Sequence, residues 1–524
     1  MKESKKYKVG ITVGVFDLFH VGHLNLLERC KAMCDKLIVA VCQDDYVTQI
    51  KKKTPVYPAA ERMRILAALK CVDEVIPVSI EETEDKMLLI KNHPFDVLFS
   101  GDDWKGTERY LRTEKQFAEF GAKIEYLPYT KGISTTQTKE RVRRRKPLSR
   151  EAAEALVGSP EEQFQKLTAR YGGYWRYEGL KDYYYLVNPY FPTPKLLNEI
   201  KANFNSLVDH YPSGIRVNSN LAAEMFGVSR EQILVGNGAA ELIQAYMSCT
   251  DGVAGFIYPT FEEYANRYPV DKRIVYWASP DNGFRYRAKE IIEFFSKNRV
   301  ATIILVNPDM PSGNFLPMSD IDELTAWTAS EGVKLLIDES FIDFADQPYT
   351  CINADYLSSN PHVCVMKSIS KSYGVPGFRL GVLASGDELF ISRMKKTVSI
   401  WNINSFGEYF LQIIGDYKKE YAEGCRQIAA ERNRFMGELR KIPFLKIYPS
   451  AANFVLVEVL PPHSSIALSE ALWRDGKILF RDCSKKKGFK GRSFARIAVR
   501  NREDNDFLLR LLRQMGYSES SVLK

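Results

Sequence analysis

The sequence predicts an α/β protein of two domains, each built around a largely parallel sheet. The first observation is length, because 524 residues are too many for one ordinary hydrophobic core. The second is a repeated alternation of short apolar runs with longer amphipathic segments. This alternation favours parallel strands joined by right-handed crossovers, and ligands then bind beyond the carboxyl ends of the strands.

Residues 8–128 contain the first alternation. Five runs are typical of strands: KVGITVGVF, KLIVAVCQ, EVIPVS, DVLFSG and KIEYLP. The segments LNLLERCKAM and AAERMRILAALK between them have helical periodicity. From Arg141 the chain becomes basic and polar, so we place the first domain at residues 1–142 and a linker at 143–165.

Residues 166–524 contain the second alternation. Its candidate strands are QILVGNG, GVAGFIYP, TIILVNP, KLLIDESF, VCVMKSIS and FRLGVLAS, separated by helical stretches. A segment of this length suits a large α/β enzyme domain with a smaller domain appended to it.

Composition excludes several classes of protein. Apolar residues make up 45% of the chain and charged residues 26%, which is an ordinary globular balance. No apolar run approaches the roughly 18 residues of a membrane span, and the start MKESKKYKVG lacks the apolar core of a secretion signal. The nine cysteines form no CxxC pair, which favours reduced thiols and no zinc site. We therefore expect a cytoplasmic protein that does not associate with membranes.

The net charge of +8 is concentrated in a few basic runs, at Lys51–Lys53, Arg141–Lys146 and Lys485–Lys487. Such runs suit nucleic acid or small phosphorylated ligands. No nucleic-acid motif accompanies them, so we expect no nucleic-acid partner.

The stretch GVFDLFHVGH, residues 14–23, places His20 and His23 close together in a chain that has only six histidines. It follows a predicted strand and enters a helix predicted to begin near Val21. Backbone N–H groups and the helix dipole favour phosphate at such a junction, and two imidazoles can stabilise charge on a transferred phosphorus. Ordinary loop histidines are one alternative. A metal pair is another, but further ligands are not evident nearby, so we assign no metal site.

Together with more distant motifs, this stretch resembles the HxGH nucleotidyltransferases. The similarity is greatest to the glycerol-3-phosphate, choline-phosphate and ethanolamine-phosphate cytidylyltransferases. It covers residues 8–142 and includes Lys51–Lys53, AAERMRI, VDEVIP, SGDDWKG and KGISTTQTKERV. The resemblance implies a Rossmann-like nucleotidyltransferase domain. In that family an acceptor phosphate oxygen attacks the α-phosphorus of CTP and pyrophosphate leaves, with catalysis by positioning and charge stabilisation.

The resemblance also implies roles for individual residues. His20 and His23 would act on the triphosphate, and Mg²⁺ is expected with CTP. Asp17 and Arg62 would support the site, while Asp103 and Trp104 would lie at the cytidine. The full nucleotide-binding set is Val15, Phe16, Asp17, Lys51, Lys53, Arg62, Asp103, Trp104, Ser134, Thr135 and Thr136.

One departure affects the acceptor. The family usually has RTEGISTT, whereas this chain has YTKGISTT, with Tyr129 for arginine and Lys131 for glutamate. The loss of a guanidinium and the reversal of a charge could change the acceptor, so glycerol phosphate is not assigned.

Four motifs of the second domain indicate a catalytic site only when they are considered together. They are NPDMPSG (307–313), LLIDESFIDF (335–344), SISKSYGVPGFRLG (368–381) and ARIAVRNREDN (495–505). Alone, a lysine in a serine-rich loop is usually solvated, and an aspartate after a strand is often a helix cap. Together they meet the needs of pyridoxal phosphate, which requires a lysine, a carboxylate for its pyridine nitrogen and donors for its phosphate.

The order of these motifs over residues 180–515 resembles the fold type I aminotransferases and their histidinol-phosphate branch. The resemblance implies the PLP-dependent transferase fold type I, with a large α/β domain and a small C-terminal α+β domain. Lys371 would bond to the cofactor aldehyde and move the substrate Cα proton, Asp338 would pair with the pyridine nitrogen, and Asn307 would bond the 3′-oxygen. The remaining implied cofactor contacts are Phe261 stacked on the ring, with Gly238, Ala239, Ala240, Ser368 and Arg379 around the phosphate. Tyr211 would reach the cofactor of a neighbouring subunit, which implies a homodimer.

The type of reaction is less determined by these residues. The aminotransferase branch usually has DEAY, whose tyrosine is Phe341 here. DESFIDF, YPSAANFVLV and ILFRDC with ARIAVRN resemble L-threonine-O-3-phosphate decarboxylase, whose substrate-binding arginines match Arg481 and Arg496. Lys485–Lys487 and Arg492 could add phosphate contacts, although a solvated loop is the more ordinary role.

The fusion favours an enzyme in which one domain makes the substrate of the other. The leading hypothesis joins O-phospho-L-serine decarboxylation to cytidylyl transfer onto ethanolamine phosphate, giving CDP-ethanolamine. An aminotransferase that makes serinol phosphate, or a phosphonate version, remains an alternative. A regulator with a PLP-binding sensor domain is remote, because residues 1–140 carry a catalytic nucleotide motif in place of a DNA-binding one.

Overall fold

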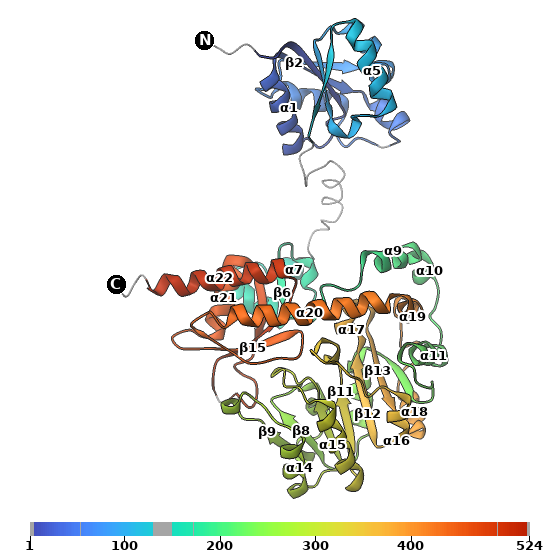
Figure 1. Ribbon diagram of the computed structural model, residues 1–524, viewed down its shortest axis with the longest axis vertical. Helices are drawn as coiled ribbons and strands as arrows, with labels where there is room; N and C mark the ends of the chain where they lie inside the picture. The colour runs from blue at the N-terminus through green and yellow to red at the C-terminus, as the bar shows by residue number, and fades with distance from the viewer. Residues whose placement is uncertain (1–4, 53, 129–148, 171, 490, 521–524) are drawn as a thin grey trace. The chain divides into compact units, whose positions relative to one another are not determined.

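The computed structural model describes residues 5–52, 54–128, 149–170, 172–489 and 491–520. The chain divides into two compact units, Met1–Ser149 and Arg150–Lys524 (Figure 1). Helix α7 (Arg150–Glu154) and the first part of α8 (Pro160–Ala169) fall in the expected linker, and both helices belong to the second unit. Helix α8 is joined to α21 (Ser465–Gly476) by a hydrogen bond of 3.2 Å from Trp473 Nε1 to Gln163 Oε1.

The first unit contains a five-stranded sheet in the order β3-β2-β1-β4-β5, and all of its strand pairs are parallel. The strands are β1 (Tyr7–Gly14), β2 (Cys34–Cys42), β3 (Glu74–Val78), β4 (Val97–Gly101) and β5 (Lys123–Leu127). These are the five strands expected from the sequence. Chain order reverses between the neighbours β1 and β4, so the loops after these strands meet at a topological switch point, where such sheets bind ligands.

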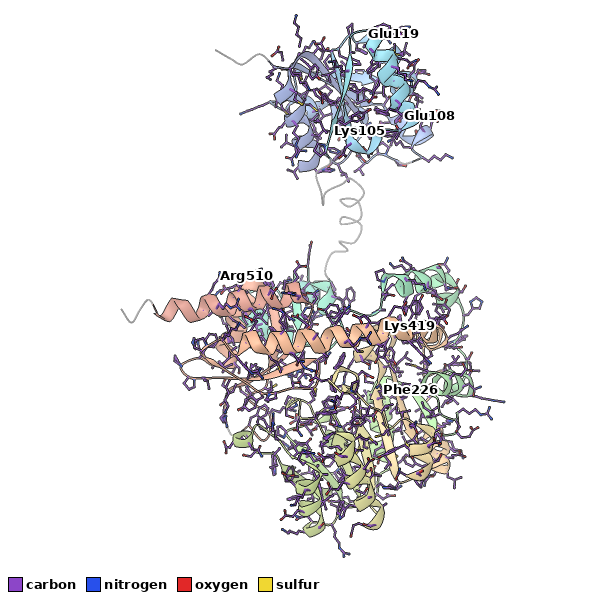
Figure 2. The ribbon with its side chains drawn as sticks, viewed as in Figure 1. Lys105, Glu108, Glu119, Phe226, Lys419 and Arg510 are labelled. Atoms are coloured by element: carbon purple, nitrogen blue, oxygen red, sulfur yellow. The ribbon has the colours of Figure 1, made fainter. Side chains whose placement is uncertain are left out.

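Helices cover both faces of this sheet, and each face packs into its own apolar cluster. The elements are α1 (Val21–Met33), η1 (Tyr46–Ile50), α2 (Ala59–Ala67), α3 (Ile80–Glu84), α4 (Lys86–Asn92), η2 (Asp102–Trp104) and α5 (Glu108–Glu119). The start of α1 agrees with the predicted start near Val21. Helix α5 turns Tyr110, Thr113 and Phe117 inward, while Glu108 and Glu119 lie on its solvent side (Figure 2).

The second unit is centred on a seven-stranded sheet in the order β7-β13-β12-β11-β10-β8-β9. Its strands are β7 (Ile233–Asn237), β8 (Ala254–Tyr258), β9 (Arg273–Trp277), β10 (Thr302–Val306), β11 (Lys334–Asp338), β12 (Val363–Ser368) and β13 (Leu380–Ser385). Strand β13 runs antiparallel to both of its neighbours, whereas the other pairs are parallel. Central strands such as β10 are buried along their whole length, as expected for a sheet covered on both faces.

A second, five-stranded sheet has the order β14-β15-β17-β16-β6. Strand β6 (Lys181–Tyr183) comes from the start of the unit, while β14 (Leu445–Ile447), β15 (Phe454–Val459), β16 (Ile478–Asp482) and β17 (Phe494–Ala498) come from its end. The long helices α20 (Lys418–Leu439) and α22 (Arg502–Ser520) pack beside this sheet (Figure 1). This pairing brings Tyr184, which follows β6, next to the arginines of β16 and β17.

The other elements of the second unit complete the layers around its large sheet. They are η3 (Tyr174–Arg176), α9 (Pro194–Ala202), α10 (Phe204–Asp209), α11 (Ile215–Phe226), α12 (Gly238–Ser248), α13 (Glu263–Asn266), η4 (Val270–Lys272), η5 (Pro280–Asn282), α14 (Ala288–Lys297), α15 (Met318–Ser330), η6 (Ile342–Phe344), α16 (Ala354–Ser359), α17 (Ile369–Ser372), η7 (Pro376–Phe378), α18 (Glu388–Lys395), α19 (Ser405–Ile413) and η8 (Ile414–Tyr417). Within the described ranges, no helix has the length and apolar character needed to cross a membrane.

Candidate active sites

The loop after β1 is held in an unusual backbone conformation. Phe16 and Leu18 have φ angles of 54° and 48°, in the left-handed region that residues other than glycine rarely adopt. Phe16 is buried, and a Cβ added at Gly14 would lie 2.8 Å from its ring. The side chain of Phe16 therefore belongs to the core, and this loop can offer a nucleotide its backbone rather than that side chain.

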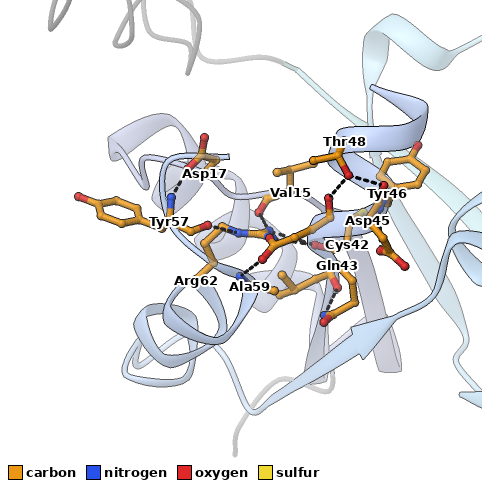
Figure 3. A network of polar contacts seen from close by, with 12 residues as sticks. Val15, Asp17, Cys42, Gln43, Asp45, Tyr46, Thr48, Tyr57, Ala59 and Arg62 are labelled. Carbon is orange, nitrogen blue, oxygen red and sulfur yellow. Dashed lines mark hydrogen bonds and ion pairs between the residues drawn. The ribbon is translucent and has the colours of Figure 1, made fainter. Parts of the chain in front are cut away.

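Arg62 and Asp17 tie this loop to the rest of the first unit (Figure 3). Arg62 donates from Nε to the Tyr57 carbonyl at 2.9 Å, from Nη1 and Nη2 to the Cys42 carbonyl at 3.1 Å, and from Nη1 to the Val15 carbonyl. Its Nη2 also lies 2.6 Å from Asp44 Oδ1. The Asp17 carboxylate accepts from the N–H groups of Val56 at 3.0 Å and Tyr57 at 3.1 Å. Both side chains are buried and bonded to protein, so they hold the loop in place.

His20 and His23 stack on one another, with ring centroids 3.9 Å apart and planes inclined by 16°. His20 Nδ1 caps α1 by accepting from Gly22 N–H at 3.2 Å. Within the described part of the chain, neither His20 Nε2 nor His23 Nδ1 has a hydrogen-bond partner. Buried nitrogens without partners are unfavourable, and phosphate oxygens of a ligand would relieve this cost.

Burial also sets the charge of the two rings. It lowers the pKa of His20, and together with repulsion from His20 it lowers the pKa of His23 to about 4, although Asp17 acts in the opposite direction. Both rings are therefore neutral near pH 7 in the free protein. Nearby phosphate charges would raise both pKa values and favour protonation.

The other predicted residues of the first site are less constrained. Asp103 and Trp104 lie in η2 after β4, across the switch point from the β1 loop, and Trp104 stacks on Tyr110 at 5.2 Å. Lys51 is exposed, with Nζ 5.9 Å from the Tyr46 ring. Four predicted residues lie outside the described residues, namely Lys53, Ser134, Thr135 and Thr136; so do Tyr129 and Lys131. No group of three or more potential metal ligands occurs in the described ranges.

In the second unit, the carboxyl ends of neighbouring parallel strands bring the predicted residues together. Asn307 follows β10, Asp338 ends β11, and Ser368 ends β12 just before Lys371 on α17. The strand register pairs Val306 with Asp338. Lys371 Nζ lies 4.1 Å from the centre of the Phe341 ring and 5.6 Å from that of the Phe261 ring.

Lys371 differs from Lys367, the other lysine of the KSISK stretch. Burial lowers the pKa of Lys371 to about 8; Asp338 opposes this effect and Arg496 adds to it. Burial also disfavours the charge of Lys367, but Asp343, 2.8 Å from its Nζ, and Glu339 together outweigh burial and raise its pKa. Lys371 therefore has the more available neutral amine, which a nucleophilic lysine needs.

Asp338 and Asn307 are both buried and held by tyrosines that the sequence analysis did not identify. Asp338 Oδ2 accepts from the Tyr264 hydroxyl at 2.8 Å, and its Oδ1 accepts from Ser340 N–H at 2.9 Å. Asn307 Nδ2 donates to the Leu316 carbonyl at 3.0 Å and to the Tyr349 hydroxyl at 2.6 Å. A bond from Asn307 to a cofactor oxygen would thus require its amide to share or give up one of these acceptors.

A cradle for phosphate forms where β7 enters α12. Gly238 has a φ of 72°, and a Cβ added there would lie 2.5 Å from Arg379 Nη2. A Cβ at Gly381 would lie 2.4 Å from the Ala239 nitrogen. These glycines let the Arg379 guanidinium and β13 approach the start of α12, where the N–H groups of a helix N-terminus can bind an anion. Ala240 follows in the first turn, and Ser368 donates its N–H to Ser340 Oγ at 2.9 Å.

Arg481 and Arg496 lie directly opposite one another on the antiparallel strands β16 and β17. Arg496 Nη2 donates to the Tyr184 carbonyl at 2.6 Å, and its buried Nε has no partner among the described residues. Burial, together with the charge of Arg481, lowers the pKa of Arg496 to about 10, although Cys483 acts in the opposite direction. The guanidinium of Arg481 lies 5.0 Å from the Tyr184 ring. Like charges placed opposite one another repel, so this arrangement suits an anionic ligand between them.

Two further predicted residues lie apart from these arginines. Arg492 donates to Glu458 Oε1 at 2.6 Å and to the Tyr448 hydroxyl at 3.0 Å, so protein partners hold its guanidinium. Tyr211 is 80% exposed and packs on Trp401 at 4.6 Å, in a surface groove that also contains Phe406. This exposure leaves Tyr211 free to extend toward another molecule.

The residues of the second site fit pyridoxal phosphate. The orphaned Arg496 Nε and the glycine-lined cradle beside Arg379 offer donors to anions. Lys371 supplies the amine, Asp338 the carboxylate and Phe261 a ring face beside that amine. Asn307 and Asp338 lie at the ends of β10 and β11, as expected from the sequence.

Comparison with known proteins agrees with both assignments. Residues 11–141 match the family model described as cytidylyltransferase-like, and residues 209–512 match the model for aminotransferase class I and II. An L-serine phosphate decarboxylase of Sulfurospirillum multivorans is 32% identical over 344 residues, covering 63% of this chain and 87% of the relative. A CMP-5′-(3-aminopropyl)phosphonate synthase of Streptomyces rubellomurinus is 31% identical over 371 residues, covering 69% of this chain. That match spans 57% of the synthase, little more than half of its length.

Solved structures resemble the second unit. A decarboxylase from Sulfurospirillum multivorans aligns with a TM-score of 0.59 and 27% identity, covering 67% of this chain and 99% of that one. A histidinol-phosphate aminotransferase from Clostridium acetobutylicum aligns with a TM-score of 0.58 and 25% identity, covering 65% and 100%. Both reaction types therefore occur among proteins with this fold.

Proposed function

The chain belongs to the aminotransferase class I and II family, and on that premise we propose that it is a bifunctional enzyme. The second unit converts O-phospho-L-serine to ethanolamine phosphate and CO₂. The first unit transfers the cytidylyl group of CTP to ethanolamine phosphate, giving CDP-ethanolamine and pyrophosphate. The observation that carries this proposal is the opposed pair Arg481 and Arg496, which suits an amino acid with two anionic groups.

Binding in the second unit follows from its charges. Arg496, as a planar fork with an unpartnered Nε, binds the substrate carboxylate, and Arg481 on the facing strand binds the phosphate. Pyridoxal phosphate, when bound, withdraws electrons from the substrate Cα. Asp338, fixed by Tyr264, would hold the proton on the cofactor nitrogen, and Arg379 with the start of α12 would hold the cofactor phosphate. Once the bond from Cα to the carboxylate carbon has broken and CO₂ has left, Lys371 Nζ delivers a proton to Cα.

Two observations favour decarboxylation over transamination. Phe341 has no hydroxyl, whereas the tyrosine usual in the aminotransferase branch has one, and its ring lies 4.1 Å from Lys371 Nζ. Two relatives named L-serine phosphate decarboxylase match over 86% and 87% of their length, at 31% and 32% identity.

An aminotransferase is the second candidate. It would make serinol phosphate or an aminophosphonate, which the first unit would then cytidylylate. The similarity to a CMP-5′-(3-aminopropyl)phosphonate synthase favours the phosphonate version of this candidate. The first unit would act in the same way on either acceptor.

In the first unit, an oxygen of the acceptor attacks the α-phosphorus of CTP, and the bond to the pyrophosphate oxygen breaks. His20 Nε2 and His23 Nδ1 lie at the start of α1, available to phosphate oxygens as charge develops. Arg62 and Asp17 keep the loop in place, and Mg²⁺ would accompany the triphosphate. Tyr211 would complete the second site of a partner subunit in a homodimer.

The test supplies the protein with pyridoxal phosphate, O-phospho-L-serine, CTP and Mg²⁺. We expect CO₂ and CDP-ethanolamine in equal amounts. A parallel assay supplies glutamate with a keto acceptor and measures 2-oxoglutarate. Formation of 2-oxoglutarate without release of CO₂ from O-phospho-L-serine would replace the decarboxylase with the aminotransferase, and absence of both products would reject both.

A further inference from the structure

The connection between β16 and β17 carries three consecutive lysines in unequal environments. Lys485 and Lys487 are exposed, whereas the side chain of Lys486 is only 14% exposed. The N–H of Lys486 donates to the Cys483 carbonyl at 2.8 Å, and Phe489 is fully buried against Phe494 at 4.3 Å. The turn and this aromatic anchor direct Lys486 inward while its two neighbours face solvent.

The positive charge of Lys486 is only partly balanced by its neighbours. Its Nζ is 3.4 Å from Glu262 Oε2, a longer separation than the 2.8 Å between Lys367 and Asp343. Burial lowers the pKa of Lys486, although the charge of Glu262 opposes this effect. The side chain of Glu262 is one-third exposed. It can therefore turn from Lys486 to water when another anion binds Lys486.

Lys486 also lies near the residues that hold the substrate. Glu262 directly follows Phe261, whose ring is 5.6 Å from Lys371 Nζ. Burial raises the pKa of the Cys483 thiol, while Arg496, Lys486 and Arg481 all act to lower it. The N–H of Cys483, two residues after Arg481, donates to the carbonyl of Phe494, two residues before Arg496, at 2.8 Å. The turn that carries Lys486 therefore begins directly beside the opposed arginines of β16 and β17.

The charge of these side chains matches that of a phosphorylated amino acid. A carboxylate contributes one negative charge, and a phosphate monoester contributes about 1.5 to 2 at neutral pH. Two arginines leave about one negative charge of such a substrate without a partner. A third cation would balance it, whereas an unphosphorylated amino acid would leave that cation unused.

We propose that Lys486 binds the phosphate of the substrate, exchanging Glu262 for it, and so selects phosphorylated over unphosphorylated amino acids. This inference rests on the proposed function of the second unit. In it, Arg496 binds the substrate carboxylate, while Arg481 and Lys486 share the phosphate. Lys486 is a specificity-determining residue at the outer end of the substrate, away from the bonds that break.

The experiment titrates ethanolamine phosphate and ethanolamine into the pyridoxal phosphate-loaded protein without CTP. The absorbance of the bound cofactor is followed because it reports the second unit alone. The variant is Lys486→Met, with Lys485→Met and Lys487→Met as matched controls on the same loop. Loss of one charge-assisted hydrogen bond should weaken ethanolamine phosphate about 10- to 100-fold in Lys486→Met. The affinity for ethanolamine should change less than about twofold in Lys486→Met. The affinities for both ligands should change equally little in the control variants.

Lys486→Arg should recover most of the affinity, because it restores a cation at the same place. Should Lys486→Met fail to fold, Glu262→Gln provides the second measurement. It removes the competing carboxylate and should tighten ethanolamine phosphate by about two- to fivefold. The inference is overturned if Lys486→Met behaves like its controls, if it weakens both ligands equally, or if Glu262→Gln does not tighten binding.

Failure of the proposed function is distinguishable from failure of this inference. A wild-type protein that releases no CO₂ from O-phospho-L-serine but loses phosphate-selective binding in Lys486→Met contradicts the decarboxylase and supports the phosphate contact. If the wild type releases CO₂ and Lys486→Met binds ethanolamine phosphate normally, the decarboxylase is supported and the phosphate contact of Lys486 is contradicted.

Discussion

The two candidate sites occupy equivalent places in their sheets but hold charge in opposite ways. Both lie beyond the carboxyl ends of parallel strands. In the first unit, Arg62 and Asp17 are bonded to protein, and the two histidines are kept neutral by burial. In the second unit, burial and the charge of Arg496 lower the pKa of Lys371. Burial and the charge of Arg481 likewise lower the pKa of Arg496.

This difference indicates how each site acquires its catalytic charge. The first site has a fixed loop and titratable rings, so its positive charge would rise only when phosphates arrive. The second site holds positive charge before any ligand binds, because arginines cannot readily lose their protons. Substitutions that affect one site should therefore leave the other nearly unchanged.

The largest expected effect is that of Lys371→Ala. Removal of the amine that moves the Cα proton should reduce CO₂ release about 10⁴-fold or more. Pyrophosphate release from CTP and ethanolamine phosphate should stay within about twofold of the wild type, because His20 and His23 are untouched. Parallel loss of both activities would contradict the independence of the two sites. Lys485→Met serves as a control for the change of charge.

Arg62→Met should have the next largest effect, on stability rather than on chemistry. It removes donors from the buried carbonyls of Val15, Cys42 and Tyr57, so we expect a loss of about 3 to 5 kcal/mol from the first unit. Calorimetry should show one unfolding transition at lower temperature and a second that is unchanged. Arg64→Met, on the exposed face of the same helix, should leave both transitions in place.

His23→Asn should lower cytidylyl transfer about 10²- to 10³-fold, the usual cost of one lost group that stabilises a transition state. Release of CO₂ from O-phospho-L-serine should not change. Initial rates of both reactions in one preparation make the comparison, with His93→Asn as a matched control in the first unit. A variant with full transferase activity would remove His23 from the proposed mechanism.

The smallest effect concerns pH. The pKa of His23 is about 4 in the folded protein, below its ordinary value of 6.5, so the folded state binds this proton less readily than the unfolded state. Neutral His23 therefore stabilises the folded state fully above pH 6.5, and about 3 kcal/mol of the free energy of unfolding should be lost as the pH falls toward 4.

Binding of CTP should show the opposite dependence. Phosphates raise the histidine pKa, so CTP affinity should increase as the pH falls from 8 to 6, by no more than about tenfold per pH unit for each proton taken up. Denaturation and binding curves for the wild type and His23→Asn measure both trends. Equal slopes for the two proteins would show that another group titrates.

The sequence predicted the strands well because their apolar runs are buried on both faces. All five strands of the first sheet and six of the large second sheet lie where periodicity placed them. Strand β9 was missed because its residues are only half-buried and its flanks are charged. The five strands of the smaller sheet were not predicted either. The reversed direction of β13 was also missed, because pairing direction depends on contacts between distant segments and leaves no pattern within the strand.

The candidate site was predicted less completely than the fold. The roles of Lys371, Asp338 and Asn307 were assigned from the resemblance to fold type I enzymes, and the strand ends that carry them converge at one edge of the sheet. The contacts of Tyr264, Tyr349 and Tyr184 with these residues or with Arg496 could not be assigned in this way, since they depend on side-chain packing. Tyr264 lies three residues after Phe261, and this closeness in the sequence is a signal that could have suggested it. The separation of Lys486 from Lys485 and Lys487 likewise required the fold of the loop.

The central claim, two sites acting in sequence on one chain, is tested most directly by phosphorus NMR of a single reaction. The mixture contains O-phospho-L-serine, CTP, Mg²⁺ and the pyridoxal phosphate-loaded protein. The wild type should form CDP-ethanolamine, His23→Asn should accumulate ethanolamine phosphate, and Lys371→Ala should form CDP-ethanolamine only when ethanolamine phosphate is added. Mixing the two variants should restore the product from O-phospho-L-serine. Formation of CDP-ethanolamine from O-phospho-L-serine by Lys371→Ala alone, or failure of the wild type to form it, would contradict the account.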